Sequence, residues 1–332
     1  PGGNQPPVAV IATDKLSGSA PLPVQFNSVG SFDPDGTVVA FAWDFGDGNS
    51  SSEANPAHIY NSVGMYRATL TVSDNNGATH SDVVTVNVVD GTTIGAGNVS
   101  GLWSLAGSPY RIDGDITVPA GETLSIEPGV QVIFQGWYKL TVNGQLDAAG
   151  SEADPILFTA TNNWLGIRFV DAADGSQLTH VIVERGQATG ANPENKGGGI
   201  YVENSSPIIS DSTIRDNTAK GAGGGVYLTN SNAILNNNTV ANNTAGTSGS
   251  SAAGGGVYLA NSDVELTGNM ISGNRVYISG SYSTPSGYGG GIYAGSSSPM
   301  LRNNVISNNI VDANLNSNAR GGGIYFAYGS PV

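Results

Sequence analysis

The feature that most constrains this chain is a glycine-triplet motif that recurs in its second half. Gly-Gly-Gly followed by Ile or Val and then Tyr occurs five times in the 332 residues, at 197–199, 223–225, 254–256, 289–291 and 321–323. An Asn stands 18 residues after the last glycine of each of the first four triplets. The segments between that Asn and the next triplet vary in length, with 5, 10, 14 and 11 residues. A core of fixed length joined by loops of free length is the signature of a solenoid of stacked coils.

Aliphatic residues fall into columns when the coils are aligned on the triplets. The first two columns stand two residues apart, and their members are Ile200, Val226, Val257, Ile292 and Ile324, and Val202, Leu228, Leu259, Ala294 and Phe326. Two later columns hold Ile209, Leu235, Leu266 and Leu301, and Ile214, Val240, Ile271 and Ile306. A period of two places alternate side chains on one face of a strand. We therefore predict three short strands per coil, with these residues inside and successive coils paired as parallel strands.

The repeated Asn residues form a polar column within this apolar pattern. They are Asn217, Asn243, Asn274 and Asn309. We predict an internal structural ladder in which each side-chain amide bonds the coils above and below. The glycines suit a sharp turn into the first strand, where positive φ or close backbone approach is needed. A phosphate-binding glycine loop would require a helix to follow, and no segment here has a helical period.

One tyrosine per coil lies between the two inward columns of the first strand. These residues are Tyr201, Tyr227, Tyr258, Tyr293 and Tyr325. By alternation they should point outward and stack in a row. Such a row could bind sugar rings or a protein partner. It could instead serve only to stabilise the sheet through neighbouring pairs. Both interpretations stay open from the sequence.

The first ninety residues have a different pattern, with short alternating runs separated by turn signals such as Asp35-Gly36 and Asn76-Gly77. About seven short strands in this length predict a β-sandwich. The segment 43–48, Trp-Asp-Phe-Gly-Asp-Gly, together with Ser-Phe-Asp-Pro-Asp-Gly at 31–36, resembles a PKD domain, an immunoglobulin-like module. We expect Trp43 to fill the core between the sheets. The resemblance implies a non-catalytic extracellular spacer or adhesion unit.

Some PKD domains bind calcium near the start of the domain, and the resemblance makes Asn4, Asp33 and Asp35 the candidate metal ligands here. Carboxylate and amide oxygens suit this hard cation. The alternative is ordinary turn chemistry, because Asp-x-Asp-Gly is also a common turn sequence. Calcium is the one cofactor that we consider.

The second half resembles the right-handed parallel β-helix of the pectin-lyase-like proteins. The likeness extends upstream through 121–134 and 140–146 to Trp164-x-Gly166-Ile167. We therefore predict an all-β chain: a PKD-type β-sandwich at 1–90, a short linker at 91–97 and a β-helix at 98–332. Within the β-helix we assign a leading segment to 98–163 and coils to 164–332. The same scaffold carries lyases, hydrolases, adhesins and fibres, so the fold does not name an activity.

Composition narrows the class of partner. A net charge of −14 opposes nucleic acid and anionic lipid as partners. The chain has no Cys, which excludes disulfides, and no apolar run long enough to span a membrane. It opens Pro-Gly-Gly-Asn, and we interpret it as an exported protein, extracellular or at the cell surface, after removal of a signal peptide that this chain does not contain.

The last coil is expected to be incomplete, because Ser330-Pro331 aligns with Ser206-Pro207, where the second strand of a coil begins. An open coil leaves apolar side chains and strand edges uncovered. If another copy covered it head to tail, the assembly would not close and would grow as a fibre.

We assign no catalytic residues from the sequence. The outward face of the first strand offers Arg168, the tyrosines and a single acid, Glu203, whereas glycoside hydrolysis needs a pair of carboxylates. Our interpretation is a non-catalytic structural or adhesive protein of the surface or matrix, with copies of itself or a polysaccharide as partner. The alternatives are a polysaccharide-active enzyme of lyase type, with the tyrosines and Arg168 in its groove, and a carbohydrate-binding adhesin that uses the tyrosine row.

Overall fold

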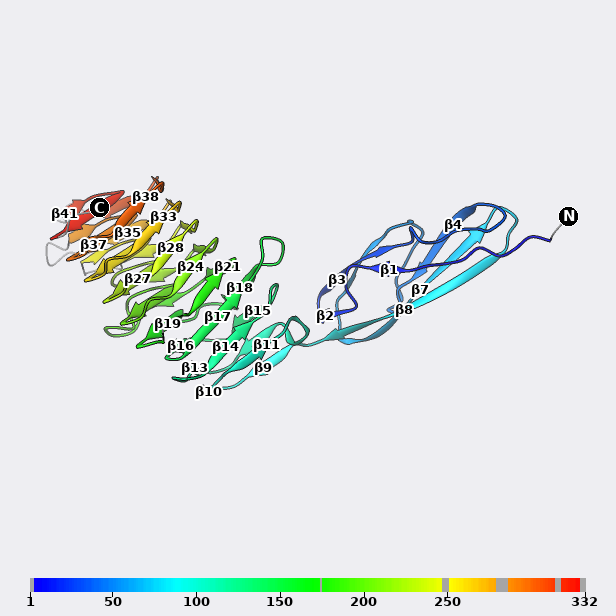
Figure 1. Ribbon diagram of the computed structural model, residues 1–332, viewed down its shortest axis with the longest axis horizontal. Helices are drawn as coiled ribbons and strands as arrows, with labels where there is room; N and C mark the ends of the chain where they lie inside the picture. Colours follow the sequence, from blue (N-terminus) through cyan, green and yellow to red (C-terminus); the bar gives the residue numbers. More distant parts are fainter. Residues whose placement is uncertain (1–2, 174, 247–250, 279–285, 314–317, 329–332) are drawn as a thin grey trace. The chain divides into compact units, whose positions relative to one another are not determined.

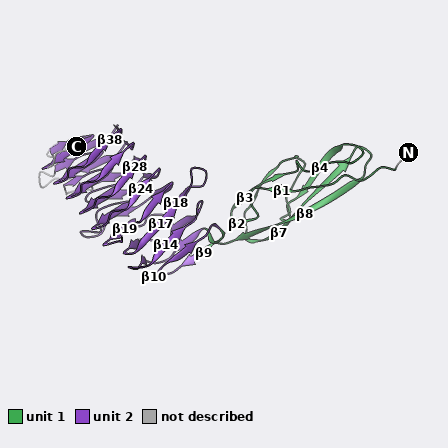
Figure 2. Cartoon of the chain, viewed as in Figure 1, with its two compact units in different colours: residues 1–92, 106–108 green, residues 93–105, 109–332 purple. Residues whose placement is uncertain are grey.

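The computed structural model describes residues 3–173, 175–246, 251–278, 286–313 and 318–328. The chain divides into two compact units, which Figure 2 colours separately: 1–92 with 106–108, and 93–105 with 109–332. Both are built from β-strands, and the one helical element within the described residues is a 3-10 turn, η1 (Leu105–Gly107). The all-β prediction and the order of sandwich followed by β-helix are confirmed.

The first unit is a sandwich of a five-stranded and a three-stranded sheet (Figure 1). The larger sheet has the order β2-β8-β7-β4-β5 and the smaller one β1-β3-β6. Their bounds are β1 (Ala12–Thr13), β2 (Ser17–Ser19), β3 (Leu22–Asn27), β4 (Val38–Asp44), β5 (Ser50–Ser51), β6 (Ala57–Tyr60), β7 (Gly64–Asp74) and β8 (Thr79–Val89). The core between them contains Phe26, Trp43, Tyr60 and Leu70, all at most 2% exposed. Trp43 therefore fills the position that the sequence predicts for it.

A network of short hydrogen bonds fixes the turn after β4. The carboxylate of Asp44 accepts the backbone N–H of Gly46 at 2.9 Å, and that of Asp47 accepts Asn49 at 3.1 Å. The Nε2 atom of His58 lies 2.8 Å from Oδ2 of Asp47, and the His58 ring stacks on Phe45. Burial opposes ionisation of Asp47, but the hydrogen bonds from His58 and Asn49 outweigh it and lower the pKa of this carboxyl. Side-chain bonds to backbone thus hold a turn that glycine makes possible.

The second unit is a helix of parallel strands in three long sheets. The first sheet has nine strands, each entering a coil: β10 (Gly97–Asn98), β13 (Ile116–Val118), β16 (Leu140–Val142), β19 (Ile167–Val170), β23 (Ile200–Glu203), β27 (Val226–Thr229), β32 (Val257–Ala260), β37 (Ile292–Gly295) and β42 (Ile324–Ala327). Their register aligns each triplet with the next, so that Ile200 pairs with Val226 and Val226 with Val257. The five tyrosines therefore occupy one register position.

The other two long sheets complete each coil. The second sheet contains β11 (Gly101–Trp103), β14 (Thr123–Ile126), β17 (Gln145–Ala149), β20 (Gln177–Thr179), β24 (Ile208–Ser210), β28 (Ile234–Asn236), β33 (Glu265–Thr267) and β38 (Met300–Arg302). The third contains β9 (Thr92–Ile94), β12 (Tyr110–Ile112), β15 (Gln131–Phe134), β18 (Ile156–Ala160), β21 (Val181–Glu184), β25 (Thr213–Arg215), β29 (Thr239–Ala241), β34 (Met270–Ser272) and β39 (Val305–Ser307). Three strands per coil is the arrangement that the aliphatic columns predict.

Two shorter parallel sheets arise from the loops of variable length. One contains β22 (Gln187–Ala188), β26 (Thr218–Ala219), β30 (Thr244–Ala245), β35 (Arg275–Ile278) and β40 (Ile310–Ala313). The other contains β31 (Ala252–Ala253), β36 (Ser286–Tyr288) and β41 (Asn318–Arg320). The sequence predicts loops of free length here, and the structure shows that parts of these loops pair as parallel strands in register between successive coils.

The predicted linker also needs correction. Residues 91–97 contain strand β9 and the first residue of β10, which join the third and first sheets of the β-helix. These residues form the edge strands of those two sheets, because β12 and β13 each offer them parallel backbone partners on one side.

The core of the β-helix consists of the predicted columns. Their members up to Ala294 are fully buried, whereas Leu301 and Ile306 of that coil and Ile324 and Phe326 of the last described coil are only partly buried. The expected incompleteness of that coil rests on Ser330 and Pro331, which lie outside the described residues.

The Asn column forms a continuous hydrogen-bonded ladder through the interior. Nδ2 of Asn217 donates to Oδ1 of Asn243 at 3.0 Å, Asn243 donates to Asn274 at 3.0 Å, and Asn274 to Asn309 at 2.9 Å. Each Nδ2 also donates to a backbone carbonyl of the preceding coil, such as that of Val183. Each Oδ1 in turn accepts a backbone N–H, so the buried amides are satisfied on both sides.

A second Asn ladder was missed in the sequence. Asn238 donates to Asn269 at 3.1 Å, and Asn269 donates to Asn304 at 3.0 Å. Ser212 occupies the same place in the preceding coil and donates its backbone N–H to Asn238. All three Asn residues stand 13 positions after the last glycine of their triplet, at 225, 256 and 291. This fixed spacing was a readable signal.

Each glycine of a triplet is required for its own reason, as the second repeat shows. Gly223 has φ of +65°, a conformation that side chains disfavour. A Cβ on Gly224 would lie 2.3 Å from the carbonyl oxygen of Gly255 in the next coil. A Cβ on Gly225 would lie 2.9 Å from the Nδ2 atom of the ladder residue Asn243. The triplet therefore lets neighbouring coils and the Asn ladder approach closely.

Replacement of the middle glycine tests this account. We expect Gly224→Ala to lower the free energy of unfolding of the β-helix by about 3 kcal/mol, because the backbone atoms that it meets cannot move independently of the stack. Denaturant titration followed by circular dichroism measures this loss. Gly95→Ala is the control, since a Cβ there meets no atom within 4 Å. Equal stability of the two variants would contradict the packing argument.

Candidate functional site

The most prominent surface feature of the β-helix is a stack of tyrosine rings along the first sheet, here called the tyrosine ladder. Its members are Tyr201, Tyr227, Tyr258, Tyr293 and Tyr325, paired in register. Ring centroids are 4.6–5.8 Å apart and the rings are within 15° of parallel. The ring faces of interior members are thus turned toward each other. A ligand approaching from the side would meet ring edges and hydroxyl groups.

The exposure of the ladder differs from the expectation at one end. Tyr201 and Tyr227 were predicted to be exposed, but they are only 3% and 5% exposed. They pack with Ala222, and Nζ of Lys196 lies 4.9 Å from the centre of the Tyr227 ring. Isolated β-bridges between loops of successive coils, Lys196 with Ala222 and Ala222 with Ala253, hold these residues against the ladder. Tyr258, Tyr293 and Tyr325 are partly exposed, as the alternation predicts.

A further tyrosine joins the more exposed end of the ladder. Tyr288, the last residue of β36, has its ring centre 4.7 Å from that of Tyr325 and 6.2 Å from that of Tyr293. Its ring is tilted by 34° and 49° to theirs, so its face is not fully covered by them. Four aromatic side chains, those of Tyr258, Tyr288, Tyr293 and Tyr325, therefore gather over the last described coils.

Three of the ladder tyrosines, Tyr201, Tyr258 and Tyr293, have raised pKa values that favour the neutral hydroxyl. Burial raises the pKa of Tyr201, and a hydrogen bond from its hydroxyl to Glu203 at 2.9 Å raises it further. Burial and the electrostatic influence of adjacent ladder tyrosines likewise raise the pKa of Tyr258 and Tyr293. A tyrosinate in this stack would lie beside other rings in a poorly hydrated place, and its charge would be unfavourable.

Arg168 occupies the next register position below the ladder. It pairs with Tyr201 across β19 and β23, and its guanidinium carbon lies 5.0 Å from the centre of the Tyr201 ring. This is a cation–π arrangement at the end of the aromatic stack. The residue is only 4% exposed, whereas the alternative of a lyase-type enzyme would place it in the groove.

The candidate calcium ligands Asn4 and Asp35 lie at one end of the PKD domain, here called its tip. There they contact Asp74, Asn76 and Gln5, which we did not predict. Asn4 donates to Asp74 at 2.8 Å and accepts from Asn76 at 2.7 Å. Both oxygens of Asp35 accept the backbone N–H of Gln5. The hydrogen bond from Asn4, with backbone N–H groups of the β7–β8 turn, lowers the pKa of Asp74. Amide and carboxylate groups therefore satisfy one another here.

Asp33 differs from these neighbours. Its Oδ2 atom is buried and has no hydrogen-bond partner among the described residues. This atom and Oδ1 of Asn75 would each lie 2.4 Å from a Cβ placed on Gly36, so they flank the same point. Within the described part of the chain, no three His, Asp or Glu side chains are grouped as metal ligands. A cation at this tip would thus depend on Asn oxygens as well as on Asp33.

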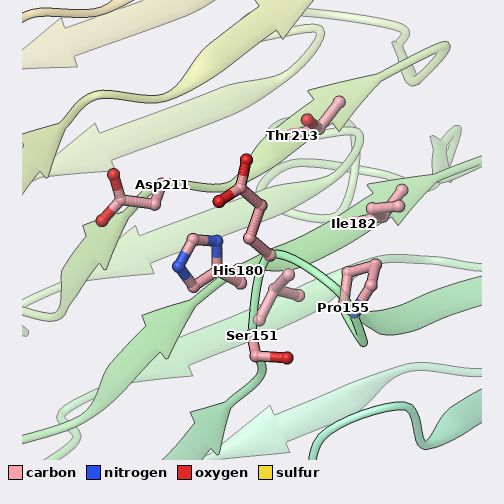
Figure 3. A pocket seen from close by; sticks show the side chains of 8 residues that line it. Ser151, Pro155, His180, Ile182, Asp211 and Thr213 are labelled. Atoms are coloured by element: carbon pink, nitrogen blue, oxygen red, sulfur yellow. The ribbon is translucent and has the colours of Figure 1, made fainter.

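A shallow hollow of about 230 Å³ lies at a corner of the β-helix, between the second and third sheets. Figure 3 shows the His180 ring among the residues that line it, with Ser151, Asp211 and Thr213 around it. Glu152 also lines it, so the fold gathers two acids around a histidine that the sequence left without an obvious carboxylate. Oδ1 of Asp211 accepts a hydrogen bond from Asn237 at 3.3 Å. The groups come from three successive coils.

The raised pKa of the ladder tyrosines predicts the alkaline behaviour of the β-helix. Because the folded state holds these protons above the ordinary tyrosine pKa of about 10, the stability that they contribute is present below that pH and is lost as pH rises above it. We expect part of the tyrosinate absorbance to appear only together with the loss of the β-sheet circular dichroism signal.

Two substitutions identify the tyrosines responsible. Tyr201→Phe and Tyr258→Phe should each reduce the late part of the tyrosinate signal, whereas Tyr328→Phe, at a side chain that is 96% exposed, should leave it unchanged. Ionisation of all tyrosines before any loss of the fold would be incompatible with a buried, neutral ladder.

No helix among the described residues is both long enough and apolar enough to cross a membrane.

A family model for the PKD domain matches residues 4–88, and one for the right-handed β-helix region matches residues 159–332, more than half of the chain. The collagenase ColQ1 of Bacillus cereus (strain Q1) is 46% identical over 69 residues, which is 21% of this chain and 7% of the collagenase. The collagenase ColA of Clostridium perfringens is 41% identical over 87 residues, or 26% of this chain and 8% of that enzyme.

A solved structure described as the PKD1 domain of Vibrio anguillarum Epp is 40% identical, covering 26% of this chain and 96% of that one with a TM-score of 0.24. The chain thus spans less than a tenth of the length of the collagenases that it matches, and the kinship is one of domains. Relatedness to the PKD domains of collagenases and proteases, with a β-helix region, indicates an extracellular or surface protein. The chain carries a PKD domain and belongs to the right-handed β-helix family.

Proposed function

We propose that this chain is part of a structural and adhesive protein of the cell surface or extracellular matrix, in which the β-helix is a rigid rod and the PKD domain a spacer. The observation that carries the proposal is the continuity of the interior ladders. The amides of Asn217, Asn243 and Asn274 are fully buried, and each is bonded to the coils on both sides. Such a stack transmits force along one dimension through backbone and side-chain hydrogen bonds.

The proposal includes self-association along the stack. The apolar side chains of Ile324 and Phe326 are partly buried, whereas those at the same register positions in the preceding coil are fully buried. A further coil with Asn at the ladder positions would cover them and pair with β42. When such a coil comes from another copy, the contact is head to tail and does not close.

Negative-stain electron microscopy of the purified chain, with and without calcium, tests this role. Filaments of stacked subunits are expected, and they should become shorter or disappear when Phe326 is replaced by Glu, which places a charge at the end of the core. The matched control is Arg302→Glu, at an exposed position of β38. Dispersed particles of the native chain at all concentrations would count against self-association.

A second candidate function, polysaccharide binding, is favoured by the four tyrosines that gather over the last described coils. Their partly exposed edges and hydroxyls, with the tilted ring of Tyr288, offer both apolar contact and hydrogen bonds to a sugar. We expect Tyr288→Ala and Tyr258→Ala to weaken glycan binding by about tenfold each, with Tyr110→Phe, in the upstream core, as control. If incubation with the same glycan produced absorbance from a new unsaturated sugar, the protein would be a lyase and the proposed non-catalytic role would be wrong.

Calcium is the cofactor that we propose for the PKD tip, supported by the unpartnered buried Oδ2 of Asp33. Asp33 and the amide oxygen of Asn75 would hold the ion, with rearrangement of Asn4 and Asp35. Adding calcium should then raise the melting temperature of the native chain but not of Asp33→Asn, whereas Glu53→Gln, another PKD acid, should respond as the native chain does. An equal response of all three would show that calcium does not bind at this tip.

A further inference from the structure

The side chain of Arg168 has two buried donor groups without a hydrogen-bond partner among the described residues. Its Nε donates to the carbonyl oxygen of Leu165 at 3.2 Å, but Nη1 and Nη2 are buried and have no hydrogen-bond partner among the described residues. Removing a charged group from water without partners costs several kcal/mol. Burial accordingly lowers the pKa of this guanidinium to about 10, while Glu194 and Tyr201 oppose the shift. The group is still a cation at neutral pH.

Other basic residues gather at the same place. Nζ of Lys139 lies 3.8 Å from Oε1 of Glu194, the acid that acts on Arg168. Nζ of Lys196 lies 3.2 Å from the hydroxyl of Tyr227, the ladder neighbour of Tyr201. Three of the 12 basic residues in a chain with net charge −14 therefore surround the buried end of the tyrosine ladder. Such a local reversal of charge favours an anion.

Glu194 is the group in this cluster that a ligand could replace. Its side chain is 39% exposed, and that of its partner Lys139 is 27% exposed, so their ion pair is partly open to solvent. Glu194 is the carboxylate that pairs with these cations, while a second one, Glu203, lies nearby and accepts the hydrogen bond of the Tyr201 hydroxyl at 2.9 Å. The segment that carries Glu194, between β22 and the first glycine triplet, varies in length from coil to coil and is not fixed by the repeat.

We propose that Lys139, Arg168 and Lys196 form a binding site for an oxyanion, a carboxylate or sulfate, carried by a sugar polymer. The anion takes two hydrogen bonds from Nη1 and Nη2 of Arg168, and Glu194 moves aside. A guanidinium matches the two oxygens of such a group in a bidentate manner. This site is separate from the self-association and from the four-tyrosine cluster.

Three polymers with one backbone test the proposal: dextran, carboxymethyl dextran and dextran sulfate. Binding is measured by calorimetry on the full chain at a protein concentration where electron microscopy shows dispersed particles. We expect the two charged polymers to bind and neutral dextran not to bind. If only one of them binds, that result identifies the oxyanion. A single-stranded DNA oligonucleotide that bound as tightly would show a general polyanion surface and overturn the assignment to a sugar.

Variants locate the site. We expect Arg168→Gln to weaken binding of the charged polymers by at least about tenfold. Arg168→Lys should bind more tightly than Arg168→Gln but less tightly than the native chain, because lysine keeps the charge and loses the bidentate geometry. Lys196→Gln should weaken binding by about threefold, and Glu194→Gln should strengthen it by about threefold. Arg302→Gln removes a charge from the exposed β38 position and should have no effect.

The outcomes separate this inference from the proposed function. If Arg168→Gln is folded by circular dichroism and binds as the native chain does, the site is wrong, whatever the filaments show. If that variant does not fold, the opposite effects of Lys196→Gln and Glu194→Gln decide. Loss of binding in Tyr288→Ala but not in Lys196→Gln would place the anionic polymer at the four-tyrosine cluster instead.

Discussion

The hydrogen bonds that pass from one coil to the next through buried Asn side chains are the interaction on which the β-helix depends. A buried primary amide must satisfy two donors and an acceptor. In the ladder from Asn217 to Asn309 this is possible only when neighbouring coils are in register, since each amide bonds the next one and a backbone group. A shift of register would leave buried polar groups without partners, at a cost that no apolar contact there offsets. The ladders thus select one alignment.

Register then determines the surface. Because each coil places its tyrosine at the same position, the rings stack at 4.6–5.8 Å and cover one another's faces. An aromatic stack of this kind can contact a ligand or a partner only at its ends and at its exposed edges. One end meets the buried Arg168, and the other gathers Tyr288 beside Tyr325. The chemistry that we propose lies at these two places for that reason.

The PKD domain reaches its stability by a different route. Its core packs aromatic rings around Trp43, and the turn after β4 is fixed by Asp44, Asp47 and His58 rather than by repetition. At its tip, an Asn side chain and backbone N–H groups bond the carboxylates of Asp35 and Asp74, whereas the buried Oδ2 of Asp33 has no hydrogen-bond partner among the described residues. A small domain of this kind uses local polar networks where the solenoid uses neighbouring coils.

The sequence alone determined the order of domains, the three strands per coil, the inward columns and the Asn217–Asn309 column. Residues that every coil needs at the same position recur at a fixed spacing, and this spacing can be recognised in the sequence. The second Asn column had an equally regular spacing and was overlooked. Tertiary structure alone decided which tyrosines are covered, why Nη1 and Nη2 of Arg168 have no hydrogen-bond partner among the described residues, and how Glu152, His180 and Asp211 come to line one hollow. Those outcomes depend on loops that differ between coils and on residues tens of positions apart. Periodicity encodes what every coil repeats, whereas side-chain exposure depends on segments that occur only once.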